Sequence, residues 1–211
     1  MTPVPVDQTT WYADDHGPFL YKTVSGDFRA EIDIAVGRRT DMTQPPRGQY
    51  NQAGLVVRDP ASTAPGHERW IMYNLGFQNT AFAREAKTTR PGQSGSLSTL
   101  YLVETAPGVY SGKLRVCRVG DTFYFHHQMS GETGWTEEAY GGNTVPMGNG
   151  AGEATPGVTA GGAIRFQRAD MPAAVQLGML VGNWGAPLEA RGEFGYLRLA
   201  AVASPADCSV P

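Results

Sequence analysis

Two carboxylates stand close together near the start of the chain, in the stretch EIDI at residues 31–34. A retaining glycosidase places two carboxyl groups roughly 5 Å apart, one as the nucleophile and one as the acid/base. A strand can supply such a pair from residues four positions apart on one face, but AVG follows here and a second glutamate is absent. We therefore expect Glu31 and Asp33 to lie on the solvated face of a strand and to pair with arginines on adjacent strands.

The adjacent histidines His126 and His127 are the next residues that could bind a metal or act as a base. Neighbouring residues of a strand point to opposite faces of a sheet, so the two cannot chelate one ion together. The sequence also has no nucleophile elbow, phosphate-binding glycine motif or HExxH helix. The glycine-rich residues 141–162 lack the strand and helix that frame a nucleotide site, and we expect them to form a loop.

Three acidic residues in predicted loops, Asp41, Asp59 and Glu68, could hold a structural calcium ion. Calcium takes six to eight oxygen ligands, commonly from carboxylates. No loop shows the regular ligand spacing of a calcium motif, so these three residues are the only basis for the hypothesis. We expect no other cofactor.

Residues suited to holding sugars are spread over several predicted strands. Aromatic rings stack on the C–H faces of sugars, and planar polar groups reach paired hydroxyls. The candidate ligand-binding residues are Arg58, Tyr73, Arg84, Arg115, Tyr124, His126 and Trp184. If the polar sides of their strands share one concave sheet face, these side chains should converge on a ligand. The alternative is that they cover an ordinary sheet surface.

The elements that would position these residues are strands, because apolar residues alternate with polar ones along most of the chain. We predict about ten strands. A short strand ends at residues 25–27, and others cover 28–36, 52–59, 68–77, 81–89, 98–104, 174–184 and 192–202. Residues 112–131 form a hairpin that turns at 119–122. On 174–184, Gly178 and Gly182 share a face with Trp184 and leave room for a ligand or a neighbouring backbone.

Three polar segments rich in glycine and proline interrupt this pattern, at residues 38–51, 58–68 and 140–163. Long loops in a compact domain are usually functional or mobile. They could contact a protein partner, and the loop 140–163 could cover the concave face. We find no internal repeat and no linker, and we expect one domain over residues 1–211.

The composition excludes several classes of protein. The 27 glycines and 15 prolines among 211 residues favour many short strands over helices, and we expect less than about a tenth of the chain in helix. The 17 basic residues face 20 acidic ones without a basic cluster, so nucleic acid is an unsuitable partner. The apolar runs are too short for insertion into a membrane.

The two cysteines, Cys117 and Cys208, do not form a metal motif. Either Cys117 is a buried thiol in an apolar strand, or it is bridged to the C-terminal tail. The N-terminal residues 1–5 have neither a basic region nor an apolar core typical of an export signal. We expect an extracellular or cell-envelope location if such a signal has been removed, and a cytoplasmic one otherwise.

Several of these segments, in this order, resemble a bacterial family of concanavalin A-like proteins labelled "regulation of enolase". The segments are GDF at 26–28, AGLVVR at 53–58, and the hairpin followed by Ser130-Gly131 and Trp135, within a resemblance over about residues 17–200. The resemblance implies a two-sheet antiparallel jelly-roll sandwich, found alone or attached to secreted carbohydrate-active enzymes, and it implies no catalytic residues. In laminarinase- and lichenase-like enzymes of this superfamily, a second glutamate follows the motif that EIDI resembles.

The sequence thus predicts an all-β, lectin-like sandwich that binds a glycan or polysaccharide without cleaving it. The first alternative is a glycoside hydrolase or lyase of the same fold. The segment His126-His127-Gln128 loosely resembles the Gln-x-His strand of alginate-lyase-type jelly-rolls. The second alternative is a structural or protein-interaction domain that uses its long loops.

Overall fold

The computed structural model describes residues 11–12, 17–62, 64–141 and 144–211. Within these residues the chain forms thirteen strands and one short 3₁₀ helix, η1 (Pro205–Cys208). The first strands are β1 (Phe19–Ser25), β2 (Phe28–Arg38), β3 (Asn51–Arg58), β4 (Trp70–Phe77), β5 (Phe82–Gly92) and β6 (Gly95–Glu104). The others are β7 (Ser111–Val119), β8 (Thr122–Met129), β9 (Thr136–Glu137), β10 (Val145–Met147), β11 (Arg165–Gln167), β12 (Ala174–Gly182) and β13 (Ala190–Ala201).

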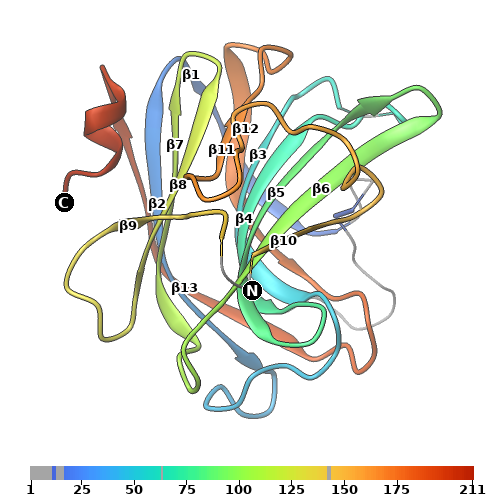
Figure 1. Ribbon diagram of the computed structural model, residues 1–211. Coiled ribbons are helices and arrows are strands. Elements are labelled where there is room, and N and C mark those ends of the chain that lie inside the picture. Colours follow the sequence, from blue (N-terminus) through green and yellow to red (C-terminus); the bar gives the residue numbers. More distant parts are fainter. Residues whose placement is uncertain (1–10, 13–16, 63, 142–143) are drawn as a thin grey trace.

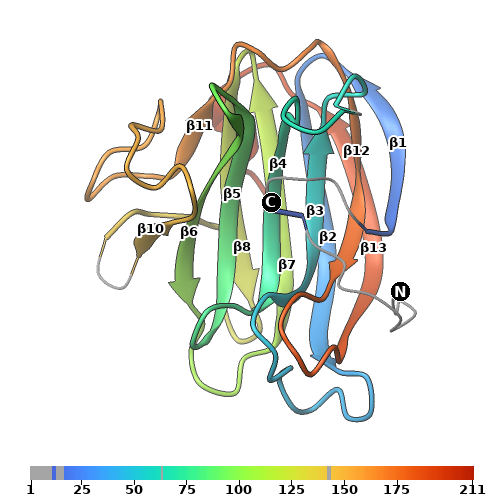
Figure 2. The same ribbon diagram turned by 90° about the vertical axis from the view of Figure 1, so that its right-hand side faces the viewer.

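The strands form two antiparallel sheets packed face to face, which confirms the predicted all-β sandwich (Figure 1). The seven-stranded sheet has the order β1-β12-β3-β4-β5-β6-β10, and most of it faces the viewer in Figure 2. The six-stranded sheet has the order β11-β8-β7-β2-β13, and β9 pairs with β8. The almost complete absence of helix from the described residues follows from the two-residue period of the chain.

The core lies between the two sheets and is built by alternate residues of each strand. From β2 it receives Phe28, Ala30, Ile32, Ile34 and Val36, which are all buried. Side chains of the seven-stranded sheet pack against them, among them Leu55, Val57, Ile71, Leu75, Val175 and Leu177. Burying one such side chain contributes about 1.5–3 kcal/mol. The opposite sides of the same strands therefore form the two outer faces of the sandwich.

The predicted strand positions agree with the structure, except in the region after β8. The turn of the β7–β8 hairpin lies where the sequence placed it, because β7 ends at Val119 and β8 begins at Thr122. The short strands β9, β10 and β11 were not predicted, since two or three residues are too few to show a period. Gly178 accommodates a neighbouring backbone, because a Cβ atom there would lie 2.0 Å from the carbonyl oxygen of Leu20 on β1.

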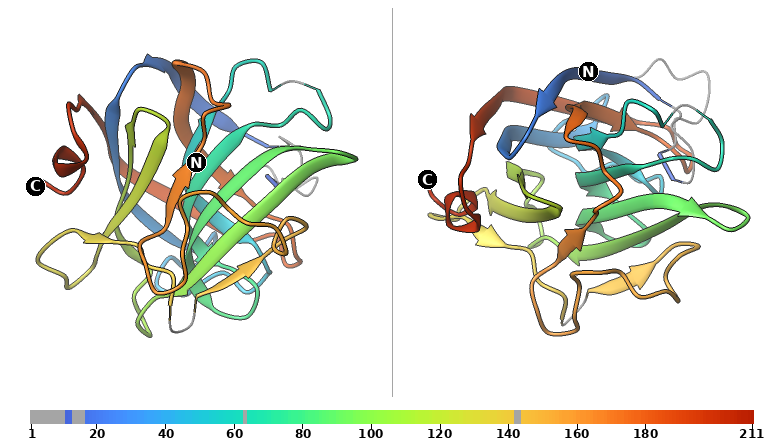
Figure 3. Two further views of the ribbon diagram at one scale, coloured as in Figure 1. Left: turned by 45° about the horizontal axis from the view of Figure 1, so that its top comes forward. Right: turned by 90° about the horizontal axis from the view of Figure 1, so that it is seen from above.

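A disulfide joins Cys117 of β7 to Cys208 at the end of η1, which decides between the two states that the sequence left open. The bond holds the C-terminal segment against the outer face of the six-stranded sheet. In Figures 1 and 3 this segment and the loop between β8 and β9 lie on the same side of that sheet. Two protruding segments therefore flank the outer face there.

Part of the long loop 140–163 extends the edge of the seven-stranded sheet. Its strand β10 pairs with β6, and Asn149 bonds the main chain of Ser96 and Ser98. Tyr140, at its start, packs edge-on against Tyr101. Among the described residues no helix has the length and apolar character needed to cross a membrane.

Candidate functional site

The seven candidate ligand-binding residues do not converge on one face. Arg115, Tyr124 and His126 lie on the outer face of the six-stranded sheet, and their strands β7 and β8 are neighbours. Arg58 lies on the outer face of the seven-stranded sheet, and Trp184 follows the end of β12. Tyr73 and Arg84 point between the sheets. The predicted convergence of Arg58, Tyr73, Arg115 and Trp184 is therefore wrong.

Tyr73 and Arg84 belong to the interior, which corrects their predicted place on a polar surface. Tyr73 is fully buried and packs edge-on against Phe125 at a centroid distance of 5.4 Å. The Nε atom of Arg84 lies 2.8 Å from Oε2 of Glu138, a buried carboxylate that also contacts Nδ1 of His127 at 3.1 Å. Arg84 points inward because it pairs with the buried carboxylate of Glu138 between the sheets.

The outer face of the six-stranded sheet carries a row of polar residues, one on each of five neighbouring strands. The strand register aligns Arg198, Glu31, Arg115, His126 and Glu137 from β13 to β9. Residues two positions along these strands flank the row on the same face. The face thus presents cations, carboxylates and imidazole side by side.

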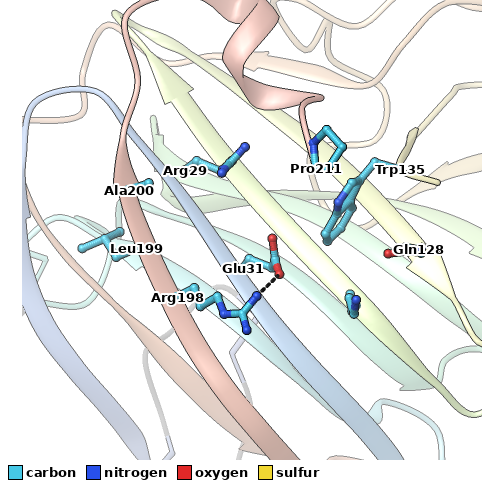
Figure 4. Close-up of a pocket in the computed structure, with 9 residues that line it drawn as sticks. Arg29, Glu31, Gln128, Trp135, Arg198, Leu199, Ala200 and Pro211 are labelled. Atoms are coloured by element: carbon cyan, nitrogen blue, oxygen red, sulfur yellow. Dashed lines mark ion pairs between the residues drawn. The ribbon is translucent and has the colours of Figure 1, made fainter. Parts of the chain in front are cut away.

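A pocket of about 420 Å³ opens beside this row (Figure 4). Its lining residues are Arg29, Glu31, Lys113, Gln128, Trp135, Arg198, Leu199, Ala200 and Pro211. The volume falls within the range of about 300–1,000 Å³ typical of small-molecule sites. Four strands build its floor, and Trp135 and Pro211 stand on the two protruding segments that flank it.

Arg115 ties these walls to the floor of the pocket, although the side chain itself is fully buried. One of its guanidinium nitrogens donates to the carbonyl oxygens of Cys208 and Val210, each at 2.8 Å. The guanidinium carbon lies 3.6 Å from the ring centroid of Trp135, a close cation–π contact. The predicted ligand-binding residue Arg115 thus positions both walls.

Glu31 is an ionised residue of the pocket and is poorly suited to act as a general acid. Its Oε2 accepts from Arg115 at 2.8 Å and its Oε1 accepts from the hydroxyl of Tyr196. Burial alone would raise the pKa of Glu31, but these hydrogen bonds outweigh it and hold the pKa below its usual value. The predicted pairing of Glu31 with arginines is confirmed, with Arg115 on β7 and Arg198 on β13.

Asp33 has different neighbours from those predicted, because the register places Lys113 and Tyr196 beside it instead of arginines. Its carboxylate lies against Gly195 of β13. It does not line the pocket.

His126 is neutral near pH 7. Burial lowers the pKa of His126 to about 4, and the charge of Glu137 only partly opposes this effect. His127 points to the opposite face of the same strand, toward Glu138, which confirms that the two histidines do not share a site. Next to His126, Tyr124 packs under the guanidinium of Arg165, which pairs with Glu137 at 2.6 Å.

The outer face of the seven-stranded sheet has a different character, because aromatic rings cover it. Trp11 packs edge-on against both Phe19 and Trp70, and Phe19 stacks on Tyr21 at 5.0 Å. The Arg58 guanidinium lies over the Trp11 ring. Side chains of the sheet bind the N-terminal segment, since Lys87 donates to the carbonyl of Trp11 and Thr89 to that of Tyr12. Residues 11–12 therefore lie across this face.

On the same face of β5 as Lys87, Glu85 is a fully buried carboxylate. Burial raises the pKa of Glu85, and Lys87 and the amides of Asn74 and Gln52 offset that only in part. Among the described residues none donates a hydrogen bond to its Oε2. Burial is the main reason that the pKa of Tyr50 is raised to about 12, and the nearby charge of Glu85 adds to this effect. Trp184, just beyond the end of β12, is 44% exposed, and its ring packs edge-on against Tyr50.

The proposed calcium ligands are engaged with local partners. Asp41 accepts from the main chain and hydroxyl of Thr43, and Asp59 accepts from the amide of Ala61. Glu68 accepts from Gly66 and Ser96. Nowhere in the described ranges do three or more His, Cys, Asp or Glu side chains gather at metal-binding distance.

Sequence reasoning missed five polar and aromatic residues of the pocket: Arg29, Lys113, Gln128, Trp135 and Arg198. Three of them stand two positions from a residue already singled out, Arg29 from Glu31, Lys113 from Arg115 and Gln128 from His126. The two-residue period was therefore a usable signal. Trp135 lies in a loop, where no periodicity indicates its direction.

Comparisons with known proteins support the fold and nothing more specific. No family model matches the chain, and no curated protein matches its sequence. Among solved structures, a functionally unknown protein from Saccharomyces cerevisiae is similar with a TM-score of 0.57 and 13% identity, over 94% of this chain and 86% of that one. A xylan β-1,4-xylosidase from Bacillus halodurans C-125 is similar with a TM-score of 0.54 and 12% identity. That match covers 91% of this chain but only 31% of the xylosidase. The likeness shows a β-sandwich fold alone, and membership of the concanavalin A-like superfamily and of the "regulation of enolase" family stays a prediction.

Proposed function

We propose that the protein binds carbohydrate in the pocket on the six-stranded sheet and does not cleave it. The observation that carries the proposal is the lining itself, in which the ring of Trp135 stands beside the planar polar groups of Arg29, Arg198 and Gln128. An aromatic ring can stack on a sugar face while amide and guanidinium groups bond its hydroxyls. The xylosidase-like fold is compatible with a role in carbohydrate metabolism.

The state of Glu31 favours binding over hydrolysis. A retaining hydrolase needs a protonated carboxyl near a second, ionised one. Both oxygens of Glu31 accept hydrogen bonds that keep its pKa low, so the group has no proton to donate at neutral pH. We expect no release of reducing sugar from laminarin or lichenan, by the wild type or by Glu31→Gln.

The binding proposal is tested with two tryptophan variants. A stacked aromatic contributes about 1 kcal/mol beyond its buried area, so Trp135→Ala should weaken glycan binding several-fold to about tenfold. Trp184→Ala is the matched control, because Trp184 lies beyond β12, outside the pocket lining. A glycan array identifies a ligand, titration calorimetry measures both variants, and thermal melts confirm that they are folded.

Weakening by Trp184→Ala alone would move the site to the other sheet, and equal weakening by both variants would contradict a site confined to the pocket. Absence of any glycan ligand for the wild type would favour the protein-interaction alternative.

A second candidate function, a polysaccharide-active enzyme, is supported by Glu85. Its raised pKa suits a general acid, and Asn74 and Gln52 could orient it. Against it, no carboxylate contributes to the pKa shift of Glu85, and residues 11–12 lie across the face. Loss of a polysaccharide-degrading activity in Glu85→Gln, with Glu31→Gln unaffected, would establish the enzyme.

A further inference from the structure

The pocket lining carries more positive than negative charge. Arg29, Lys113 and Arg198 line it, and Glu31 is the one carboxylate side chain among the lining residues. They come from three neighbouring strands, β2, β7 and β13. In Figure 4 the side chains of Arg29 and Arg198 lie on either side of Glu31.

The charge of Glu31 is already compensated by groups other than the lining cations. Arg115, beneath the pocket, donates to Oε2, and Tyr196 donates to Oε1. Arg198 is the more distant partner, with its Nη1 atom 4.0 Å from Oε1, and its side chain is 72% exposed. A pair at that distance with an exposed arginine contributes little, so Arg198 remains available to a ligand.

The arginines are held in place by neutral groups. Arg29 donates to the carbonyl oxygens of Asp207 and Val210, at 3.2 and 3.0 Å. The guanidinium of Arg198 lies over the ring of Tyr196, with 4.2 Å to the centroid. Of the nearby carboxylates outside the lining, Asp207 accepts from the amides of Ala203 and Ser204. Positioned guanidinium groups lose less freedom when they bind a planar carboxylate.

We infer that this pocket selects an anionic sugar, a uronic acid residue whose carboxylate lies among Arg29, Lys113 and Arg198 while its ring contacts Trp135. The inference rests on the proposed function and names the class of ligand at the same site. A carboxylate fits the two guanidinium groups better than a neutral hydroxymethyl group, which can form no ion pair with the lining cations.

The test is a pair of ligands that differ only at C6 of each sugar, a trigalacturonate with carboxylates and the matching neutral galactotriose with hydroxymethyl groups, titrated into the wild-type protein. Charge-assisted hydrogen bonds favour the acid by at least about tenfold. The preference should shrink when salt is raised to about 0.5 M, since salt screens exposed charges. A sulfated galactotriose separates recognition of a carboxylate from simple attraction of an anion.

Two variants locate the effect. Lys113→Ala and Arg198→Ala should each weaken binding of the uronate about fivefold to tenfold and should weaken binding of the neutral trisaccharide less, because only the uronate offers a carboxylate to these cations. The matched control is Lys22→Ala, which removes an exposed lysine from β1 of the other sheet. Thermal melts check that the variants fold.

The possible results distinguish selection of an anionic sugar from carbohydrate binding in general. Equal binding of both trisaccharides, weakened by Trp135→Ala, overturns the inference and leaves the proposed function standing. Tighter binding of the sulfated sugar than of the uronate overturns the choice of a carboxylate. Binding of neither sugar, with no glycan found on the array, removes both.

Discussion

The two outer faces of the sandwich carry similar kinds of side chain in opposite environments. On the seven-stranded sheet, Glu85 and Lys87 are buried, and Lys87 donates to the carbonyl of Trp11. On the six-stranded sheet, Glu31 and Arg198 line an open pocket, and Arg115 lies buried beneath it. A carboxylate therefore has a raised pKa on one face and a lowered pKa on the other. Burial and the available hydrogen-bond donors therefore decide what a polar strand face can do, because the same residue types occur on both faces.

The largest effect is expected between the two faces, at Glu138. Glu138→Gln leaves Arg84 and His127 without their buried counter-charge, which should cost about 3–5 kcal/mol of unfolding free energy. Chemical denaturation measures it. If glycan binding by the folded protein also changed, the ion cluster between the sheets would influence the pocket on the outer face.

Glu138 should also make the stability of the protein depend on pH. Burial alone would raise the pKa of Glu138, but its bonds to His127 and Arg84 hold it at about 2, below the usual 4.5. The stability that its ionised form contributes is present above about pH 4.5 and is lost as the pH falls toward 2. Glu138→Gln should lose less stability over that interval than the wild type, and equal acid sensitivity would contradict this.

The disulfide is expected to have the next largest effect, on the open face alone. The bond closes a loop between residues 91 positions apart, and Cys117→Ser with Cys208→Ser should lower the unfolding free energy by about 2–5 kcal/mol. It should also weaken ligand binding at the pocket, because Arg29 and Arg115 would no longer meet a fixed C-terminal wall. Calorimetric titration at a temperature where the variant is folded measures this. Unchanged binding would show that the wall is not needed.

The smallest effect is expected on the covered face, from Glu85→Gln. Because the pKa of Glu85 is raised in the folded protein, its stabilising contribution is present at low pH and is lost as the pH rises through that pKa. The glutamine variant avoids this loss and should melt a few degrees higher than the wild type near pH 7. Below about pH 4 the two should converge. A variant that melts lower at pH 7 would mean that the carboxylate is stabilised by interactions beyond those described.

Much of the fold could be predicted, because alternation along a strand is a local property. The strand from Phe28 to Val36, the turn after Val119 and the opposite directions of His126 and His127 all follow from a period of two. The candidate site was predictable only in part. The sequence placed Arg115 on the correct face, next to the pocket, but it assigned Tyr73 to the wrong side of its strand. Strand β4 has large side chains on both faces, so its sequence does not show which face meets the other sheet.

The sequence by itself determined that the chain is an all-β sandwich and that the stretch EIDI lacks the second carboxylate of a glucanase. Both depend on residue types at short spacing. Only the tertiary structure decided that Cys117 meets Cys208, that Trp135 stands over Arg115, and that residues 11–12 cover one outer face. These contacts join residues far apart in the chain, and their formation depends on sheet order and register, which follow from the packing of all the strands together.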